Sequence, residues 1–248
     1  MTNRDIIICR DSDELSQKAA ERFILLANEA GVRAGRFTVA LAGGSTPKGL
    51  YSLLATSVYN QRIPWPRVHL FWGDERCVPP DHGESNYRMV QEALLSKIHI
   101  PAQNVHRIAG EKTPVTAVAE YENELIRFFQ LSKGALPRFD LILLGIGEDG
   151  HTASLFPGSA ALDETENLVA SAYVENLKAH RITLTLPVLN ESAQVFFLVA
   201  GKGKSAIVKK LFATDSGVAN LPAARVRPVH GHRTWFITQD AAVELPAQ

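Results

Sequence analysis

The sequence predicts an α/β fold with a doubly wound, mostly parallel sheet flanked by helices on both faces. Two patterns in the 248-residue chain lead to this prediction: short apolar runs alternate with longer stretches of helical period, and most of the runs are apolar on both faces. Strands of that kind are typical of parallel sheets covered by helices on each side. No internal repeat or low-complexity linker interrupts the pattern, so we expect one domain over residues 1–248.

The apolar runs are expected to form the strands. Most of them are rich in β-branched or aromatic residues, which favour strands. In chain order they cover residues 6–9, 37–42, 68–72, 139–144, 182–186, 195–200 and 235–238.

Helices are expected between these runs. Asp11 followed by Glu14 is a helix-start signal, and the apolar stripe after it ends before Gly31. This stripe consists of Leu15, Ala19, Phe23, Leu26 and Ala30. Further helices are expected at about residues 47–58, 85–98, 114–131 and 202–212.

Composition argues against several classes of function. The 26 basic and 26 acidic side chains cancel, whereas a nucleic-acid binder usually carries a basic excess. Cys9 and Cys77 form neither a disulfide framework nor a zinc-ligand set, and His230 and His232 have no clear third ligand. No metal, cofactor or nucleic-acid partner is therefore expected.

No membrane span or export signal is expected either. The longest apolar runs, residues 23–27 and 195–200, are far shorter than the ~20 residues that cross a bilayer. The opening segment, residues 1–5, has no basic start followed by a long apolar stretch. The expected location is the cytoplasm.

The loop after the run 37–42 has the composition of a phosphate site. In an open parallel sheet, ligands bind beyond the carboxyl ends of the strands. Here Gly43 and Gly44 permit a close backbone approach, and Ser45 and Thr46 are expected to cap the helix that follows. Free N–H groups at a helix start attract anions. The alternative is a capped turn without a ligand.

The loop after the run 68–72 carries three charged residues. Arg76 is suited to clamp a phosphate or carboxylate, and Asp74 to act as a base or to orient its neighbours. The alternative is an exposed ion pair of Asp74 or Glu75 with Arg76, which would contribute about 0–1 kcal/mol.

The loop after the run 139–144 contains a candidate base. Gly145, Gly147 and Gly150 match G-x-G-x-x-G, but Pro157 and Gly158 leave no room for the helix that a dinucleotide site needs. We therefore reject a nicotinamide enzyme.

The same loop presents Glu148, Asp149 and His151 together. A histidine is the natural general base near neutral pH, and a neighbouring carboxylate can fix its tautomer. Glycine amides in the loop could stabilise an oxyanion. Two further cations, Arg181 and Lys204, lie beside strands, and the turn around Lys204 is either a second phosphate clamp or a solvated basic turn.

Three segments carry a family resemblance. They are Gly73-Asp74-Glu75-Arg76 followed by Ser85-Asn86, the unbroken Gly150-His151-Thr152-Ala153-Ser154-Leu155-Phe156-Pro157, and the segment from Arg181 to Pro187. In this order they resemble the 6-phosphogluconolactonase family, which is related to the glucosamine-6-phosphate deaminases/isomerases. The resemblance runs from Phe37 to Lys204.

The resemblance implies an activity and roles for residues. The activity is hydrolysis of 6-phospho-D-glucono-1,5-lactone to 6-phosphogluconate, the second step of the oxidative pentose phosphate pathway. His151 would be the general base, with Asp74, Glu148 and Asp149 orienting it or shaping the site. Substrate and phosphate would be bound by Gly43, Gly44, Ser45, Thr46, Arg76, Asn86, Arg181 and Lys204. The expected partner is a phosphosugar lactone, bound by a monomer or small homo-oligomer.

Two other functions stay open at this point. A glucosamine-6-phosphate deaminase should have Asn-Glu-Pro where this chain has Leu155-Phe156-Pro157, so Phe156 occupies the position of its glutamate. A non-catalytic sugar-phosphate sensor would have little need for both Asp74 and His151.

Overall fold

The computed structural model describes residues 4–174, 178–213, 218 and 220–245. Residues 1–3, part of the opening segment considered above for an export signal, lie outside the described residues. Within the described ranges, no helix combines the length and the apolar character that a membrane crossing requires.

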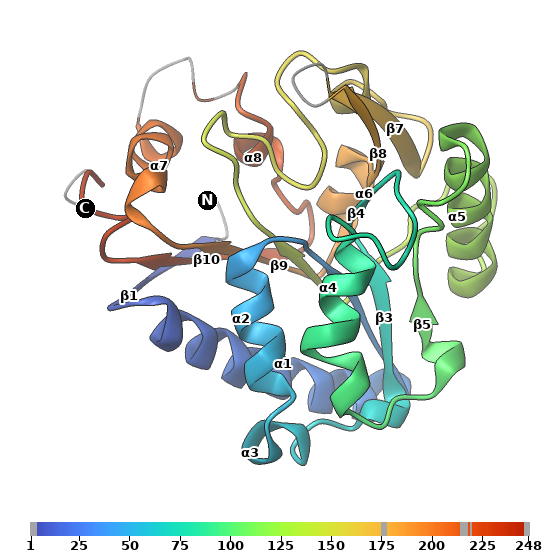
Figure 1. Cartoon of the computed structure of the whole chain (residues 1–248), viewed down its shortest axis with the longest axis horizontal. Helices are drawn as coiled ribbons and strands as arrows, with labels where there is room; N and C mark the ends of the chain where they lie inside the picture. Colours follow the sequence, from blue (N-terminus) through green and yellow to red (C-terminus); the bar gives the residue numbers. More distant parts are fainter. Residues whose placement is uncertain (1–3, 175–177, 214–217, 219, 246–248) are drawn as a thin grey trace.

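In the described part of the chain, a seven-stranded sheet forms the centre (Figure 1). All its neighbouring strands pair in parallel. In spatial order they are β1 (Arg4–Cys9), β10 (His232–Thr238), β9 (Gln194–Val199), β6 (Leu141–Leu144), β2 (Phe37–Leu41), β3 (Val68–Trp72) and β5 (Val105–His106). Strands β2 and β6 are buried along their whole length, as continuous apolar runs predict for parallel strands.

A second sheet, three-stranded among the described residues, is antiparallel. Its order is β4 (Asp74–Arg76), β8 (Ala179–Leu184) and β7 (Val169–Val174). The prediction that the run 182–186 is a strand of the parallel sheet is wrong, because that run belongs largely to β8. An apolar run carries no information about the direction of its partners, which only the chain connections determine.

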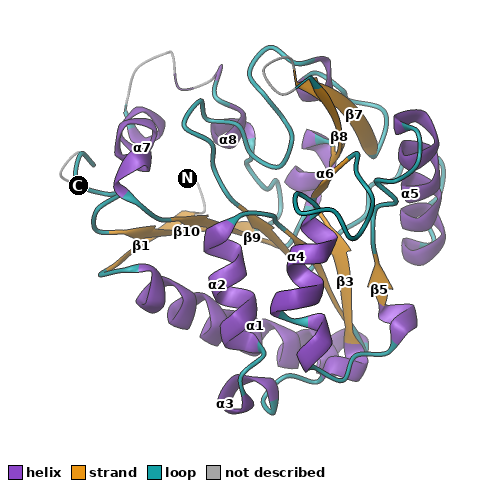
Figure 2. Cartoon of the chain, in the orientation of Figure 1, coloured by secondary structure: helices purple, strands orange, loops and turns teal. Residues whose placement is uncertain are grey.

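Helices cover both faces of the main sheet, which is therefore doubly wound. Among the described residues the α-helices are α1 (Ser12–Ala34), α2 (Ser45–Leu54), α3 (Ser57–Asn60), α4 (Asn86–Ala93), α5 (Pro114–Phe129), α6 (Leu186–Glu191), α7 (Ser205–Phe212) and α8 (Pro222–Arg225). Helices α1 and α2 lie on one side of the sheet, and α7 and α8 lie on the other (Figure 1 and Figure 2).

Helix α1 starts where the sequence predicts and ends later. The Asp11 carboxylate caps it by accepting the N–H of Glu14 at 2.9 Å. The helix continues through Gly31 to Ala34, beyond the end of the predicted apolar stripe. The stop comes at Gly35, whose φ of 73° lies in the left-handed region that terminates helices.

The chain reverses its direction of winding beside β2, and this creates a crevice for a ligand. Strand β3 follows on one side of β2, whereas β6 lies on the other side. The loops that follow the carboxyl ends of β2 and β6 therefore diverge from each other. These are the loop at residues 42–44, which leads into α2, and the loop that begins at residue 145.

Two buried tyrosines complete the backbone hydrogen bonding where β2 and β3 end. The hydroxyl of Tyr51 donates to the carbonyl of Ala42 at 2.8 Å and accepts its N–H at 3.0 Å. Tyr121 makes the same pair of bonds to Trp72, at 2.8 and 3.0 Å. Burial raises the pKa of both phenols, so they remain neutral. Each tyrosine thereby holds the end of a strand from which the chain enters the site.

Candidate active site

The loop after β2 leads directly into α2. The N-cap is Gly44, with a φ of 100°, and no side chain of the described residues caps the helix. The prediction that Ser45 and Thr46 cap it is wrong, because both residues already lie inside its first turn. Their hydroxyls and the N–H groups of the helix start are thus available to an anion.

Asn86, the first residue of α4, packs directly over Gly43. A β-carbon at Gly43 would lie 2.0 Å from Oδ1 of Asn86, so only glycine fits there. The Asn86 amide donates to the carbonyl oxygen of Asp74 at 2.9 Å and to its Oδ1 at 3.3 Å. Asn86 therefore joins the loop after β2 to the strand that carries Asp74.

The charged segment after β3 is the strand β4 rather than a loop. Asp74 and Glu75 are 6% and 2% exposed, so the alternative of an exposed ion pair with Arg76 is wrong. Glu75 accepts the N–H groups of Asn86 at 2.7 Å and Tyr87 at 2.8 Å, and thereby holds the start of α4. Burial raises the pKa of Glu75, although these hydrogen bonds act to lower it.

Arg76 and Arg181 form a pair of adjacent guanidiniums. They are cross-strand partners in the register of β4 and β8, so their side chains share one face of the small sheet. Among the described residues, the buried Nε atoms of both lack a hydrogen-bond partner. Burial lowers the pKa of Arg181, and the charge of Arg76 lowers it further. Two neighbouring cations with unused donors are suited to a doubly charged anion.

The loop after β6 holds His151 in a tight turn. The N–H of Gly147 bonds to the carbonyl of His151 at 2.8 Å, and the N–H of Gly150 bonds to the carbonyl of Gly147 at 3.0 Å. These two amides are therefore engaged within the turn and do not supply the oxyanion donors expected of glycine amides. A β-carbon at Gly147 would lie 2.0 Å from Nδ1 of His151, so the imidazole packs against this glycine.

Asp149 orients the imidazole. Its Oδ1 lies 2.6 Å from Nδ1 of His151 and accepts the backbone N–H of that residue at 3.0 Å. Burial acts to raise the pKa of Asp149, but the backbone hydrogen bond and the charge of His151 outweigh it and lower the pKa. An ionised Asp149 accepts the proton of Nδ1, which leaves Nε2 as the basic nitrogen. The ring of Phe156 covers the imidazole, with centroids 4.3 Å apart.

One pocket of about 250 Å³ brings most of the predicted site residues together. Its lining includes Gly43, Gly44, Ser45, Thr46, Asp74, Arg76, Asn86, His151, Arg181 and Lys204. Asp149 reaches the pocket through His151. Glu148 is exposed and is not part of the lining, and its proposed role stays a prediction. Thr152 and Ala153 also line the pocket, although the sequence analysis assigned them no role.

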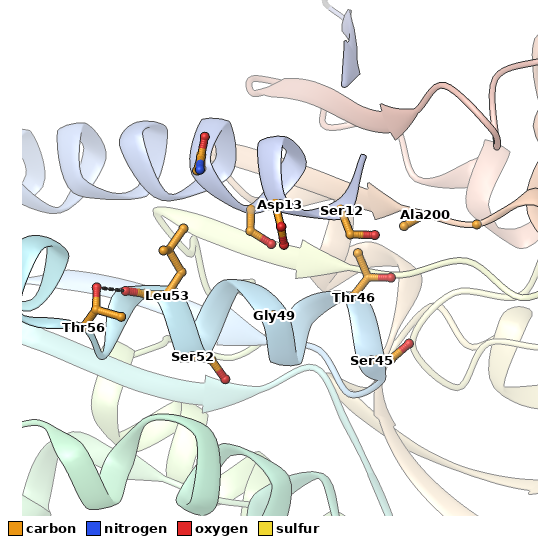
Figure 3. A pocket seen from close by; sticks show the side chains of 12 residues that line it. Ser12, Asp13, Ser45, Thr46, Gly49, Ser52, Leu53, Thr56 and Ala200 are labelled. Atoms are coloured by element: carbon orange, nitrogen blue, oxygen red, sulfur yellow. Dashed lines mark hydrogen bonds between the residues drawn. The ribbon is translucent and has the colours of Figure 1, made fainter. Parts of the chain in front are cut away.

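A larger groove of about 680 Å³ adjoins this pocket between α1 and α2. Figure 3 shows Ser12 and Asp13 of α1 opposite Thr46 of α2. The groove shares Ser45, Thr46 and Ala200 with the smaller pocket, but its lining, in the part of the chain that the structure describes, contains no histidine or arginine. The acid–base groups and the cations therefore gather in the smaller pocket.

Comparisons with known proteins relate the whole chain to one family. The chain matches the family model described as glucosamine-6-phosphate isomerases/6-phosphogluconolactonase over residues 10–235. It is 41% identical over 213 residues to the 6-phosphogluconolactonase of Nostoc sp., covering 85% of each chain. It is similar to the solved structure of 6-phosphogluconolactonase from Trypanosoma cruzi, with a TM-score of 0.87 and 30% identity over 100% of this chain and 99% of that one.

A monomeric glucosamine-6-phosphate deaminase shares the fold as well. Its solved structure has a TM-score of 0.79 and 21% identity, over 97% of this chain and 99% of that one. At this identity the likeness concerns the fold alone. The choice between the two chemistries therefore depends on the side chains of the pocket.

Proposed function

We propose, because the chain belongs to the glucosamine-6-phosphate isomerase/6-phosphogluconolactonase family, that it hydrolyses 6-phospho-D-glucono-1,5-lactone to 6-phosphogluconate. The observation that supports this most strongly is the shared pocket of His151 and the guanidiniums of Arg76 and Arg181. Pockets that bind drug-sized ligands measure about 300–1,000 Å³. The 250 Å³ found here suits one phosphorylated sugar.

The phosphate would be bound at the cationic side of the pocket. Arg76 and Arg181 offer adjacent guanidiniums, and Lys204 is a further cation in the lining. The uncapped start of α2 adds backbone donors beside Ser45. An anchor at the phosphate orients the sugar ring, so that the carbonyl meets the base in one geometry.

His151 would act as the general base. With Nδ1 directed to Asp149, Nε2 accepts a proton from water while the oxygen of that water attacks the lactone carbonyl. The tetrahedral intermediate then collapses by breaking the bond between the carbonyl carbon and the ring oxygen, and protonated His151 returns the proton to the departing ring oxygen. A positioned base contributes about 10²–10⁴-fold, and a δ-lactone is already reactive.

Phe156 favours hydrolysis over deamination. The deaminases are expected to have a glutamate at this position, and here an aromatic ring packs 4.3 Å from the imidazole, measured between centroids. The site thus lacks an acid for ring opening at that position but retains a histidine base. We further propose that the reaction serves the oxidative pentose phosphate pathway in the cytoplasm, in a monomer or small homo-oligomer.

The direct test is an assay of the purified chain on fresh 6-phosphogluconolactone, with spontaneous opening subtracted, and with glucosamine 6-phosphate in parallel. We expect turnover of the lactone alone. Ammonia release from glucosamine 6-phosphate would favour the deaminase. Binding of both sugars without turnover of either would favour a sensor.

A further inference from the structure

Ser154 connects the His151 loop to the small sheet. It is fully buried, and its hydroxyl donates to Oδ2 of Asp74 at 2.6 Å. Its N–H donates to the hydroxyl of Thr183 at 3.3 Å, which in turn donates to the carbonyl of Leu184 at 3.0 Å. Ser154 thus bonds to β4 through its side chain and to β8 through its backbone.

The point of attachment lies beside the guanidinium pair. Asp74 and Thr183 are cross-strand partners, and Arg76 and Arg181 are the partners two residues further along the same strands. Since side chains two residues apart on a strand share a face, all four lie on one face of the small sheet. Ser154 therefore docks on the face that carries the two arginines.

The chain between His151 and Ser154 is too short and too constrained to absorb a shift. Thr152 and Leu155 pair across a tight turn, with the N–H of Leu155 bonded to the carbonyl of Thr152 at 2.9 Å. Within this turn Ala153 has a φ of 48°, in the left-handed region. A fixed position of Ser154 therefore fixes the position of His151.

We propose that Ser154 is a positioning residue that sets the placement of His151 relative to the arginines and to Asp74. The inference rests on the proposed function, because that function makes His151 the base and the two arginines the anchor of the phosphate. It also defines the role of Asp74. Its Oδ1 accepts a hydrogen bond from the amide of Asn86, and its Oδ2 accepts one from the hydroxyl of Ser154. Asp74 is the attachment point of the loop rather than a second base.

The test compares Ser154→Ala and Ser154→Cys with the wild-type chain in the lactonase assay. Cysteine fills the space with a weak donor, so it separates loss of the hydrogen bond from loss of volume. We expect kcat to fall about 10–100-fold in both variants, because displacing a catalytic group by about 1 Å causes a loss of this size. KM should change less than about threefold. Ser159→Ala is the matched control, because that hydroxyl donates only to the carbonyl of Phe156 within the same loop; it should keep wild-type kcat.

A double-mutant cycle with Asp74→Asn separates positioning from general destabilisation. If Ser154 acts through Asp74, its replacement should cost clearly less kcat in the Asp74→Asn chain than in the wild-type chain. Wild-type kcat in both Ser154 variants would overturn this inference and leave the proposed function standing. So would an equal loss of kcat on replacing Ser154 in the wild-type chain and in the Asp74→Asn chain. A wild-type chain without lactonase activity would refute the proposed function and this inference with it.

Discussion

Replacing Gly147 by alanine should separate catalysis from binding. The added β-carbon would lie 2.0 Å from Nδ1 of His151 and 2.5 Å from Oδ1 of Asp149, whereas ordinary contact begins at 3.4 Å. The imidazole must therefore retreat by roughly 1 Å or more, and a displacement of that size costs about 10²-fold in rate. Overpacking of this kind also lowers the free energy of unfolding by about 1–3 kcal/mol.

Steady-state kinetics on fresh lactone measure the effect. We expect kcat of Gly147→Ala to fall about 10²-fold while KM changes little, because Gly147 is not part of the pocket lining and the arginines stay in place. Gly83→Ala is the control, because Gly83 is not part of the pocket lining and its added β-carbon would meet no described atom within 4 Å; it should keep wild-type kcat. Equal kcat values for Gly147→Ala and the wild-type chain would refute the placement of the base against this glycine.

Three further predictions concern binding and stability. Arg76→Ala should raise KM about 10–100-fold with a smaller change in kcat, and an unchanged KM in steady-state kinetics would exclude a phosphate clamp at Arg76. Burial, then the charges of His106 and Arg36, lowers the pKa of His69 to about 4, and burial lowers the pKa of His106 as well. The folded chain then binds fewer protons than the unfolded chain, so the free energy of unfolding should fall by on the order of 1–2 kcal/mol from pH 6.5 to 4. Urea titrations at several pH values should show this fall, and the fall should be smaller in His69→Asn. If the free energy of unfolding of His69→Asn depends on pH as steeply as that of the wild-type chain, the role of His69 is contradicted. Tyr121→Phe leaves the N–H and carbonyl of Trp72 without their partner, so urea unfolding should show a loss of about 1–3 kcal/mol, and no loss would contradict the role of this hydroxyl.

The sequence predicts the parallel strands well because their signal is local. A buried strand needs apolar residues on both faces, and the runs at β2, β3 and β9 show this directly. Strand β4 escapes prediction because its three residues are charged and its pairing partner lies more than a hundred positions away. Its side chains are buried by tertiary contacts that no local pattern contains.

The candidate site likewise has features that the sequence predicts and features that depend on the fold. The glycine-rich loops, His151 and Arg76 directly follow apolar runs in the sequence. Because ligands of parallel sheets bind beyond the carboxyl ends of the strands, these residues can be predicted as site residues from the sequence. The pairing of Arg76 with Arg181 depends on the register of two strands, and the role of Ser154 depends on a bond to Asp74 across 80 positions of the chain. Only the fold brings these groups together.

The central claim is that His151 performs the chemistry in a pocket whose other end binds the phosphate. The most direct measurement combines kcat of His151→Ala on fresh lactone with calorimetric binding of 6-phosphogluconate to the same variant. We predict that kcat falls by about 10²–10⁴-fold while the Kd stays within about threefold of the wild-type value. A loss of affinity as large as the loss of turnover would make His151 a binding residue and contradict the claim.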